Sequence, residues 1–260
     1  MTRIALGIEY IGTQFRGWQS QYDPVRTVQG CVEAALSRVA AHPVTVTCAG
    51  RTDAGVHASG QVVHFDTTAV RPPSAWVRGG NAHLPVDVSI RWAQVVDVSF
   101  NARFSALSRH YRYLIDNRPQ RSALQHERAY WYHYPLDTVR MQQAADYLLG
   151  EHDFSAFRAA ECQAHHAWRR LDRLQISRSG DTLSIDVTAN AFLHHMVRNI
   201  VGVLVPVGGG LKPAVWAQQV LQAQDRTQAG MTVPAHGLYL VAVHYPAHFG
   251  LTTTCHLPTD

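Results

Sequence analysis

The sequence predicts an α+β fold made of two pseudo-repeated ferredoxin-like (βαββαβ) domains, each with an antiparallel sheet and helices packed on one face. Three observations support this prediction. Strands that alternate apolar and polar residues are interleaved with amphipathic helices, the first half runs in the order β-α-β-β-α-β, and a looser version of that order follows in the second half. Because no long polar linker is visible, we expect two domains at residues 1–100 and 101–248, followed by a loose tail at 249–260.

The first half begins with a strand in which Ile4, Leu6 and Ile8 share one face. Thr27 is a suitable N-cap for a helix with an apolar stripe, and Pro72-Pro73 opens a second helical segment. In chain order, the strand, helix, two strands, helix and strand are expected at residues 3–10, 28–39, 45–50, 61–66, 72–83 and 88–96.

The second half contains more elements, and turn residues delimit them. Asp137 caps a helix that stops at Gly150, and Ser179-Gly180-Asp181 joins the two strands of a hairpin. Strands are expected at residues 110–115, 130–134, 170–178, 182–190 and 238–245, and helices at residues 138–149, 192–207 and 213–222.

Composition and charge favour a soluble, cytoplasmic, RNA-binding protein. The chain has 260 residues, 46% of them hydrophobic and 16% charged, with a formal net charge of +4 and a pI of about 9.0. Lys212 is the only lysine, so 22 of the 23 cations are arginines, which bind phosphate bidentately and stack on bases. A GC-rich genome would produce the same bias. Four cysteines without a CxxC pair suit a reduced compartment, and we expect neither a secretory leader nor a membrane span.

The stretch Gly50-Arg51-Thr52-Asp53-Ala54-Gly55-Val56-His57 places a single carboxylate in a loop of small residues. If the backbone there is extended, Arg51 and Asp53 point to the same side and Thr52 to the other. A neighbouring guanidinium would keep Asp53 ionised, as a catalytic carboxylate requires. From this octapeptide alone, a tight turn with a surface ion pair is an equally good interpretation.

Together with five further segments, this octapeptide resembles the tRNA pseudouridine synthase A family from about Ile4 to Tyr245. The other matching segments are Phe15-Arg16-Gly17-Trp18-Gln19, Ser108 to Tyr113, Asp153 to Arg158, Phe192 to Gly202 and Gly237-Leu238-Tyr239-Leu240. The resemblance implies that Asp53 is the essential catalytic aspartate, with Arg51 and Arg198 as the cations beside it. It also implies that Tyr111 meets the target base and that Leu238 lines the uracil pocket.

The resemblance further implies the reaction and the partners. The expected activity is isomerisation of uridine to pseudouridine at positions 38, 39 and 40 of the tRNA anticodon stem-loop. The enzyme would act as a homodimer, with base flipping, no cofactor and no metal, in a cleft between the two domains. Arg109 and Arg158 belong to a wider set of arginines that we interpret as phosphate contacts. Two segments depart from the family pattern, Gly208-Gly209-Gly210 and Gln125-His126-Glu127.

The residues themselves are compatible with this chemistry. A carboxylate can act as a nucleophile on the sugar or base, or as a base that removes the 2′ proton to leave a glycal, and the sequence does not distinguish the two routes. Tyr111 lies in an aromatic alternating strand, where most tyrosines belong to the core. Arg198 lies in an apolar helical run, where an unpaired charge would be costly, so a carboxylate or phosphate partner is expected. The paired histidines at 165–166 and 194–195 do not have the spacing of metal ligands.

Two functions of other classes remain open from the residues alone. A non-catalytic RNA-binding or chaperone module would keep the basic surface and the aromatic segments, but it would bind RNA without changing it. A hydrolase would need a second carboxylate beside Asp53, and none accompanies it in its loop.

Overall fold

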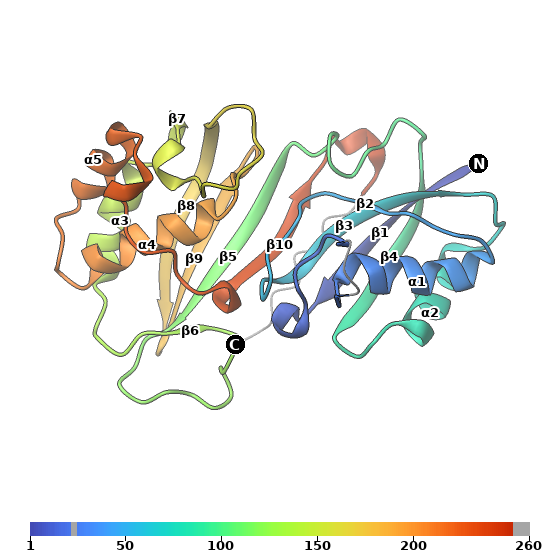
Figure 1. Cartoon of the computed structure of the whole chain (residues 1–260), viewed down its shortest axis with the longest axis horizontal. Helices are drawn as coiled ribbons and strands as arrows, with labels where there is room; N and C mark the ends of the chain where they lie inside the picture. Colours follow the sequence, from blue (N-terminus) through green and yellow to red (C-terminus); the bar gives the residue numbers. More distant parts are fainter. Residues whose placement is uncertain (22–24, 252–260) are drawn as a thin grey trace. The chain divides into compact units, whose positions relative to one another are not determined.

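The computed structural model describes residues 1–21 and 25–251, which form two compact units (Figure 1). Unit 1 comprises Met1–Arg109 and the segment that begins at Tyr239, and unit 2 is His110–Leu238. The predicted mixture of helices and sheet is confirmed, whereas the pseudo-repeat stays a prediction. Of the predicted tail, residues 252–260 lie outside the described part of the chain.

Unit 1 is built around a strongly paired central strand, β1. Its strands are β1 (Thr2–Tyr10), β2 (Thr47–Cys48), β3 (His57–Thr67), β4 (Val88–Val96) and β10 (Leu238–His244). β1 pairs antiparallel with β3 and β4, so that Ile4 faces Phe65 on one side and Val95 on the other. β10 differs from the predicted antiparallel pattern, because it pairs parallel with β3. No hairpin joins these two strands, and only a long connection allows a parallel pair.

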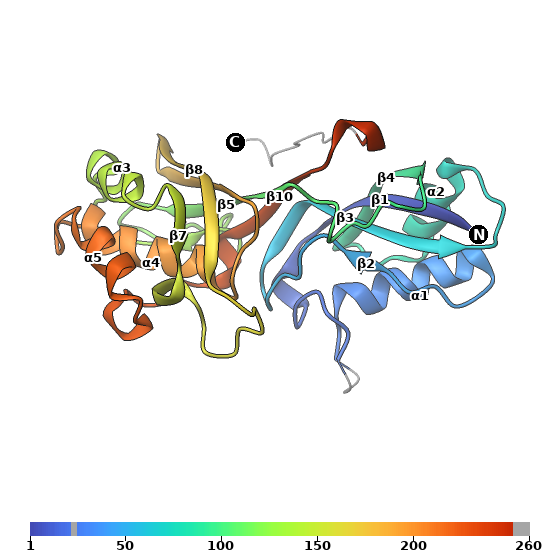
Figure 2. The same cartoon turned by 90° about the horizontal axis from the view of Figure 1, so that it is seen from above.

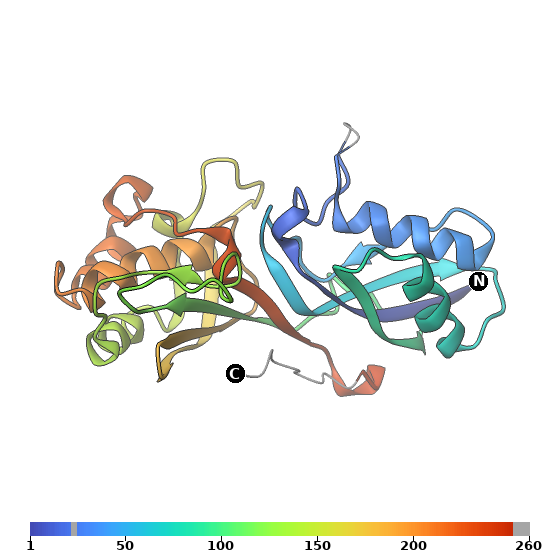
Figure 3. The ribbon, with the colours of Figure 1, turned by 90° about the horizontal axis from the view of Figure 1, so that it is seen from below.

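Two helices cover the apolar face of these strands. α1 (Val28–Ala40) begins where the Thr27 hydroxyl accepts a hydrogen bond from the backbone N–H of Gly30, as the predicted cap requires. α2 (Pro73–His83) begins directly after Pro72. A side chain at Gly80 of α2 would overlap Ile90 of β4 and reach Leu36 of α1, so the two helices and the sheet meet closely there. Figures 1 and 3 show α1 and α2 side by side.

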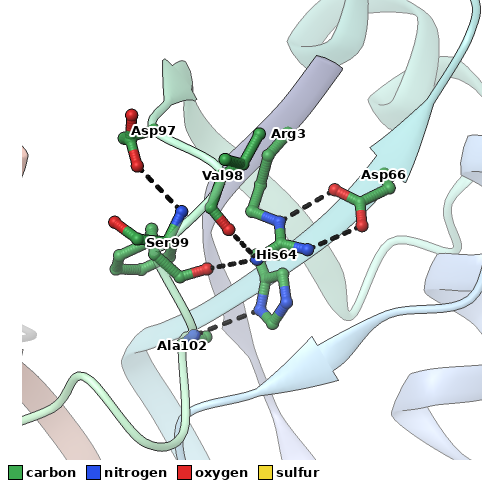
Figure 4. A network of polar contacts seen from close by, with 8 residues as sticks. Arg3, His64, Asp66, Asp97, Val98, Ser99 and Ala102 are labelled. Atoms are coloured by element: carbon green, nitrogen blue, oxygen red, sulfur yellow. Dashed lines mark hydrogen bonds and ion pairs between the residues drawn. The ribbon is translucent and has the colours of Figure 1, made fainter. Parts of the chain in front are cut away.

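A polar network fixes the turn that follows β4 (Figure 4). Arg3 forms a bidentate ion pair with Asp66, with N···O distances of 2.8 and 2.7 Å, and donates to the carbonyl oxygens of Val98 and Phe100. His64 Nδ1 accepts the backbone N–H of Ala102 at 3.1 Å. The ring of Phe100 is fully buried and packs against His64, Tyr245 and Phe249. Phe249, which lies in the predicted tail, therefore takes part in this packing.

We expect the stability of the fold to decrease between pH 7.5 and pH 5.5 because of His64. Burial and the nearby Arg3 guanidinium lower the pKa of His64 below its ordinary value of 6.5. A group with a lowered pKa in the folded state stabilises the fold above its unfolded pKa, and this contribution is lost as the pH falls. Protonation would also leave the Ala102 N–H without its acceptor, at a cost of about 1 to 3 kcal/mol.

Urea denaturation at the two pH values measures this effect, and His64→Asn is the matched control. Asparagine offers an oxygen near the Nδ1 position and does not titrate, so this variant should show a flatter pH dependence than the parent. The pKa of Asp66 is lowered by its hydrogen bonds to Arg3, so its own contribution is lost only in more acidic solution. Equal pH dependence in parent and variant would contradict the role of His64.

Unit 2 combines five strands with three α-helices. Its strands are β5 (Ser108–Asp116), β6 (Tyr130–Trp131), β7 (Gly150–Asp153), β8 (Trp168–Ser179) and β9 (Thr182–Ala189). Its helices are α3 (Thr138–Asp146), α4 (Met196–Gly208) and α5 (Trp216–Ala223). The strand order is β5-β9-β8-β7, with β6 paired to β5, and Figures 1 and 2 show α3, α4 and α5 gathered together. The predicted hairpin turns at Gly180, where φ is +55°.

Short 3-10 helices complete both units. They span Gly12–Gln14, Ser155–Phe157, Arg226–Gln228, Ala235–Gly237 and Ala247–Phe249. In the described part of the chain, no helix combines the length and the apolar character that a membrane span requires.

The helix α4 begins four residues later than the sequence predicts. His195 adopts a left-handed conformation with φ +61°, which an α-helix does not allow, so the helix starts at Met196. The preceding Phe192 instead packs its ring edge-on against Tyr111, with the centroids 4.9 Å apart. The side chains of α4 are almost all buried, as expected for a helix that is apolar all round.

Candidate active site

The loop that carries Asp53 is anchored at its start by bonds to backbone carbonyl oxygens. The Gly50 carbonyl accepts from the side-chain amide of Gln61 at 2.7 Å. The Ala49 carbonyl accepts from the guanidinium of Arg109, at 3.3 Å from Nε and 3.0 Å from Nη2. The Ala49 N–H donates to Val62, which extends the contact with β3 beyond β2. The entry of the loop is therefore held by both side chains and backbone.

Thr52 fixes the middle of the loop. Its side chain is buried and its hydroxyl lies 2.7 Å from the hydroxyl of Tyr10. Its carbonyl oxygen accepts the backbone N–H of Trp18 at 3.0 Å. Arg51 is exposed and Asp53 is half-buried, so burial alternates along residues 51–53 in the way the extended pattern predicts. With Thr52 turned inward, its two charged neighbours are left on the other side of the chain.

A tight turn follows Asp53. The N–H of Val56 donates to the carbonyl of Asp53 at 3.2 Å, and Gly55 between them has φ +80°. A glycine with positive φ at the third position is the signature of a type II turn, where a Cβ would be strained. The carboxylate thus sits at the first position of a turn that is closed by backbone atoms.

Two further glycines let the segment after β1 lie directly on this loop. A Cβ at Gly17, where φ is +89°, would lie 2.8 Å from the carbonyl oxygen of Thr52 and 3.2 Å from the carbonyl carbon of Asp53. A Cβ at Gly12 would overlap the carbonyl of Val56. The backbone at Gly12 and Gly17 therefore packs against the Asp53 loop on both sides of its turn. This close approach gives a physical reason for the glycine in the Phe15-Arg16-Gly17-Trp18 segment.

His57 supports the end of the loop from a buried position. Its Nδ1 accepts the backbone N–H of Gly12 at 3.0 Å, which places the proton of the neutral ring on Nε2. The ring stacks on Tyr239 of β10, with the centroids 4.6 Å apart and an interplanar angle of 26°. The octapeptide thus ends in a structural histidine.

In unit 1, the guanidinium of Arg109 binds backbone carbonyl oxygens. Besides the Ala49 carbonyl, its guanidinium donates to the carbonyl oxygens of Arg103 and Ala106. A side chain that binds three carbonyl oxygens of its own unit ties the segment before β5 to the Asp53 loop. Its predicted phosphate contact stays a prediction.

The other predicted site residues lie in unit 2. Tyr111 and Leu238 are buried, and Tyr111 makes the edge-on contact with Phe192 described above. Arg158 donates to the carbonyl oxygen of Cys162 at 2.6 Å and so closes its own turn. Arg198 is half-buried, and its Nε donates to the carbonyl oxygen of Val233 at 2.8 Å. This partner is a backbone carbonyl, whereas the sequence predicts a carboxylate or phosphate for Arg198, which stays a prediction.

The predicted site residues are therefore divided between the two units. Unit 1 holds Asp53, Arg51 and Arg109 on or beside one loop, and unit 2 holds Tyr111, Arg158, Arg198 and Leu238. Sequence reasoning missed the residues that support them. The sequence signal for Gly17 was the family segment around it, whereas no local pattern indicates that Thr232 and Arg226 lie beside the helix of Arg198.

Comparison with known proteins shows that the chain is similar to one family of enzymes along most of its length. A model of a tRNA pseudouridine synthase family matches residues 7–105 and 144–246. The chain is 57% identical over 251 residues to a tRNA pseudouridine synthase A of Alcanivorax borkumensis, covering 96% of this chain and 94% of the relative. It is 55% identical to that of Pectobacterium atrosepticum, with 96% and 88% covered, and 57% identical to that of Nitrosococcus oceani, with 96% of each covered. Both units contribute to the match.

Proposed function

Because the chain belongs to the tRNA pseudouridine synthase family, we propose that it converts uridines 38, 39 and 40 of the tRNA anticodon stem-loop to pseudouridine, with the ionised Asp53 as the catalytic carboxylate. As in its family, the chain is an isomerase that acts on tRNA uridines. The observation that carries the residue assignment is the Asp53 loop itself. Contacts of Thr52, Gly17 and Gly55 hold its backbone in place, and none of these contacts uses the carboxylate.

The reaction conserves every atom of the nucleotide. The bond between N1 and C1′ breaks, the base turns, a bond between C5 and C1′ forms, and the proton on C5 is lost while N1 gains one. Asp53 takes part either by attacking the sugar or base, or by removing the 2′ proton to leave a glycal. Either route requires the ionised carboxylate, which the cations Arg51 and Arg198 would favour.

The target uridine must leave the base stack before it reacts. Extrusion costs a few kcal/mol, and stacking on an aromatic ring returns about 1 to 3 kcal/mol. Tyr111 is the proposed ring, and its edge-on contact with Phe192 supports a fixed orientation. Leu238 is the proposed apolar wall of the uracil pocket, and it is buried at the start of β10.

The enzyme would act as a homodimer in the cytoplasm.

Arginines are the proposed contacts to the RNA backbone. Arg109 and Arg158 are the candidates for phosphate binding. Each phosphate contact releases counterions, so the logarithm of the tRNA association constant should fall linearly with the logarithm of the salt concentration. Filter binding between about 50 and 200 mM salt measures this slope. An affinity that does not change with salt would contradict the proposed contacts.

The test of the function uses pure protein and an unmodified tRNA transcript. After incubation, carbodiimide adducts mapped by reverse transcription should appear at uridines 38 to 40 and at no other position. Transcripts with cytidine at these three positions are the matched control and should give no adduct. Binding without any adduct would show a non-catalytic RNA-binding module, strand cleavage would show a hydrolase, and either result would overturn the proposal.

A further inference from the structure

One segment of unit 2 contacts Arg198 and contains Leu238, which are two of the proposed site residues. We call residues 226–238 the arm. The carbonyl oxygen of Val233 in the arm accepts from Arg198 Nε at 2.8 Å, and the next carbonyl, of Pro234, accepts the hydroxyl of Tyr113 at 2.8 Å. Tyr113 lies on β5 two residues beyond Tyr111, so both tyrosines face the same side of that strand. The arm ends at Leu238.

A buried polar cluster holds the arm on α4. Asn199 is fully buried, and its Oδ1 accepts the hydroxyl of Thr232 at 2.6 Å and Arg226 Nη2 at 3.1 Å. The same Nη2 donates to the Thr232 hydroxyl at 2.9 Å, and Nη1 donates to the Gly230 carbonyl at 2.9 Å. The amide group of Asn199 donates to the Phe157 carbonyl at 2.8 Å. Every polar group of Asn199 therefore has a partner.

The backbone of the arm also touches α4 directly. A Cβ at Gly202 would overlap the carbonyl of Met231, and a Cβ at Gly230 would overlap the carbonyl of Gly202. Two glycines thus bring the arm against the helix one turn beyond Asn199. Because this contact is backbone on backbone, the arm has little freedom to slide along α4.

Two consecutive residues of the arm bind two consecutive residues of α4. The Thr232 hydroxyl donates to Asn199, and the carbonyl of Val233 accepts from Arg198. We infer that Thr232 and Arg226 are positioning residues, which set the orientation of the Arg198 guanidinium through the Val233 carbonyl. The planar guanidinium has five N–H donors in a fixed fork, so fixing Nε also fixes the direction in which the other donors point. This inference rests on the proposed role of Arg198.

The inference predicts that the Thr232 hydroxyl matters for turnover more than for tRNA binding. In Thr232→Val the shape of the side chain is kept and the hydroxyl is lost, while Arg226 still satisfies Asn199 Oδ1. We expect kcat to fall about tenfold, because small misplacements of catalytic groups are costly, with KM for tRNA within about twofold of the parent. Thr232→Ser keeps the hydroxyl and should restore kcat to within about twofold of the parent.

Thr227→Val is the matched control. Thr227 lies in the same arm, and its hydroxyl donates to Asp225 at 2.8 Å instead of reaching Asn199. The same substitution there should leave kcat unchanged. Melting temperatures of all variants establish that they are folded at the assay temperature. A folded Thr232→Val enzyme with the kcat of the parent, or a Thr232→Ser enzyme as slow as Thr232→Val, would overturn the inference.

A double-mutant cycle with Arg198→Lys separates the inference from the proposed function. Lysine keeps the charge but has no Nε donor to meet the Val233 carbonyl in this geometry. If Thr232 acts through Arg198, the double variant should be no slower than Arg198→Lys alone, and full multiplication of the two losses would contradict this. An Arg198→Lys enzyme at the parent rate would overturn the inference while the proposed function stands. A parent that forms no pseudouridine would remove both.

Discussion

Pseudouridine formation is expected to fall by roughly a thousandfold or more when Asp53 is replaced by asparagine. Asparagine has nearly the same shape, but it offers neither a carboxylate nucleophile nor a base. The turn at Asp53 is closed by its backbone carbonyl and the Val56 N–H, so the loop should keep its conformation in the variant. The affinity for tRNA should change by less than about threefold, because the substitution removes no cation that contacts phosphate. Single-turnover assays and filter binding measure the two quantities.

Asp137→Asn is the matched control for this experiment. The Asp137 carboxylate caps α3 by accepting from the N–H groups of Val139 and Arg140, and asparagine caps helices about as well. This variant should keep the turnover of the parent. If Asp53→Asn also kept turnover within tenfold of the parent, another group would perform the chemistry and the assignment of Asp53 would be wrong.

The second large effect is expected for Gly17→Ala, which changes no polar group. Its new Cβ would lie 2.8 Å from the Thr52 carbonyl oxygen and 3.2 Å from the carbonyl carbon of Asp53, so the backbone of the Asp53 loop must shift. Because a displacement of about 1 Å in an active site costs up to a hundredfold in rate, we expect kcat to fall by about ten- to a hundredfold. The positive φ of Gly17 adds a conformational cost of about 1 kcal/mol to folding.

Gly180→Ala separates the two contributions. Gly180 also has a positive φ, +55°, but no atom lies within 4 Å of the place that a Cβ would occupy there, in the β8–β9 turn. The variant should lose about the same 1 kcal/mol of stability and keep its turnover. Equal turnover in the two variants would show that the contact between Gly17 and the loop has no influence on catalysis.

Local signals in the sequence predicted most elements correctly. The hydroxyl of Thr27 and the carboxylate of Asp137 cap α1 and α3 as predicted, and the expected bounds of α2 and β4 agree with the structure. The short strand β7 was missed because its four residues, Gly150–Asp153, have no apolar alternation. It forms because β8 offers an edge to pair with, which is tertiary context that a local pattern does not contain.

Sequence motifs indicated the residues of the candidate site. They did not indicate the residues that hold these in place by hydrogen bonds. Asp53 stands out because its loop is rich in glycine and small residues. Tyr10, Gln61 and Thr232 stabilise the site from distant parts of the sequence, through hydrogen bonds that depend on how the strands and the arm are folded. Arg109 illustrates the same limit, since no local pattern indicates the backbone carbonyl oxygens that its guanidinium binds.

The pairing of β10 with β3 has a consequence for biosynthesis. Residues 110–238 leave the ribosome before Tyr239 does, and they form a compact unit of strands and helices. Unit 1, although it is begun first, receives its last strand only afterwards, and Tyr239 on that strand supplies the ring on which His57 rests. The nascent polypeptide therefore completes the support of the Asp53 loop as one of the final steps of folding.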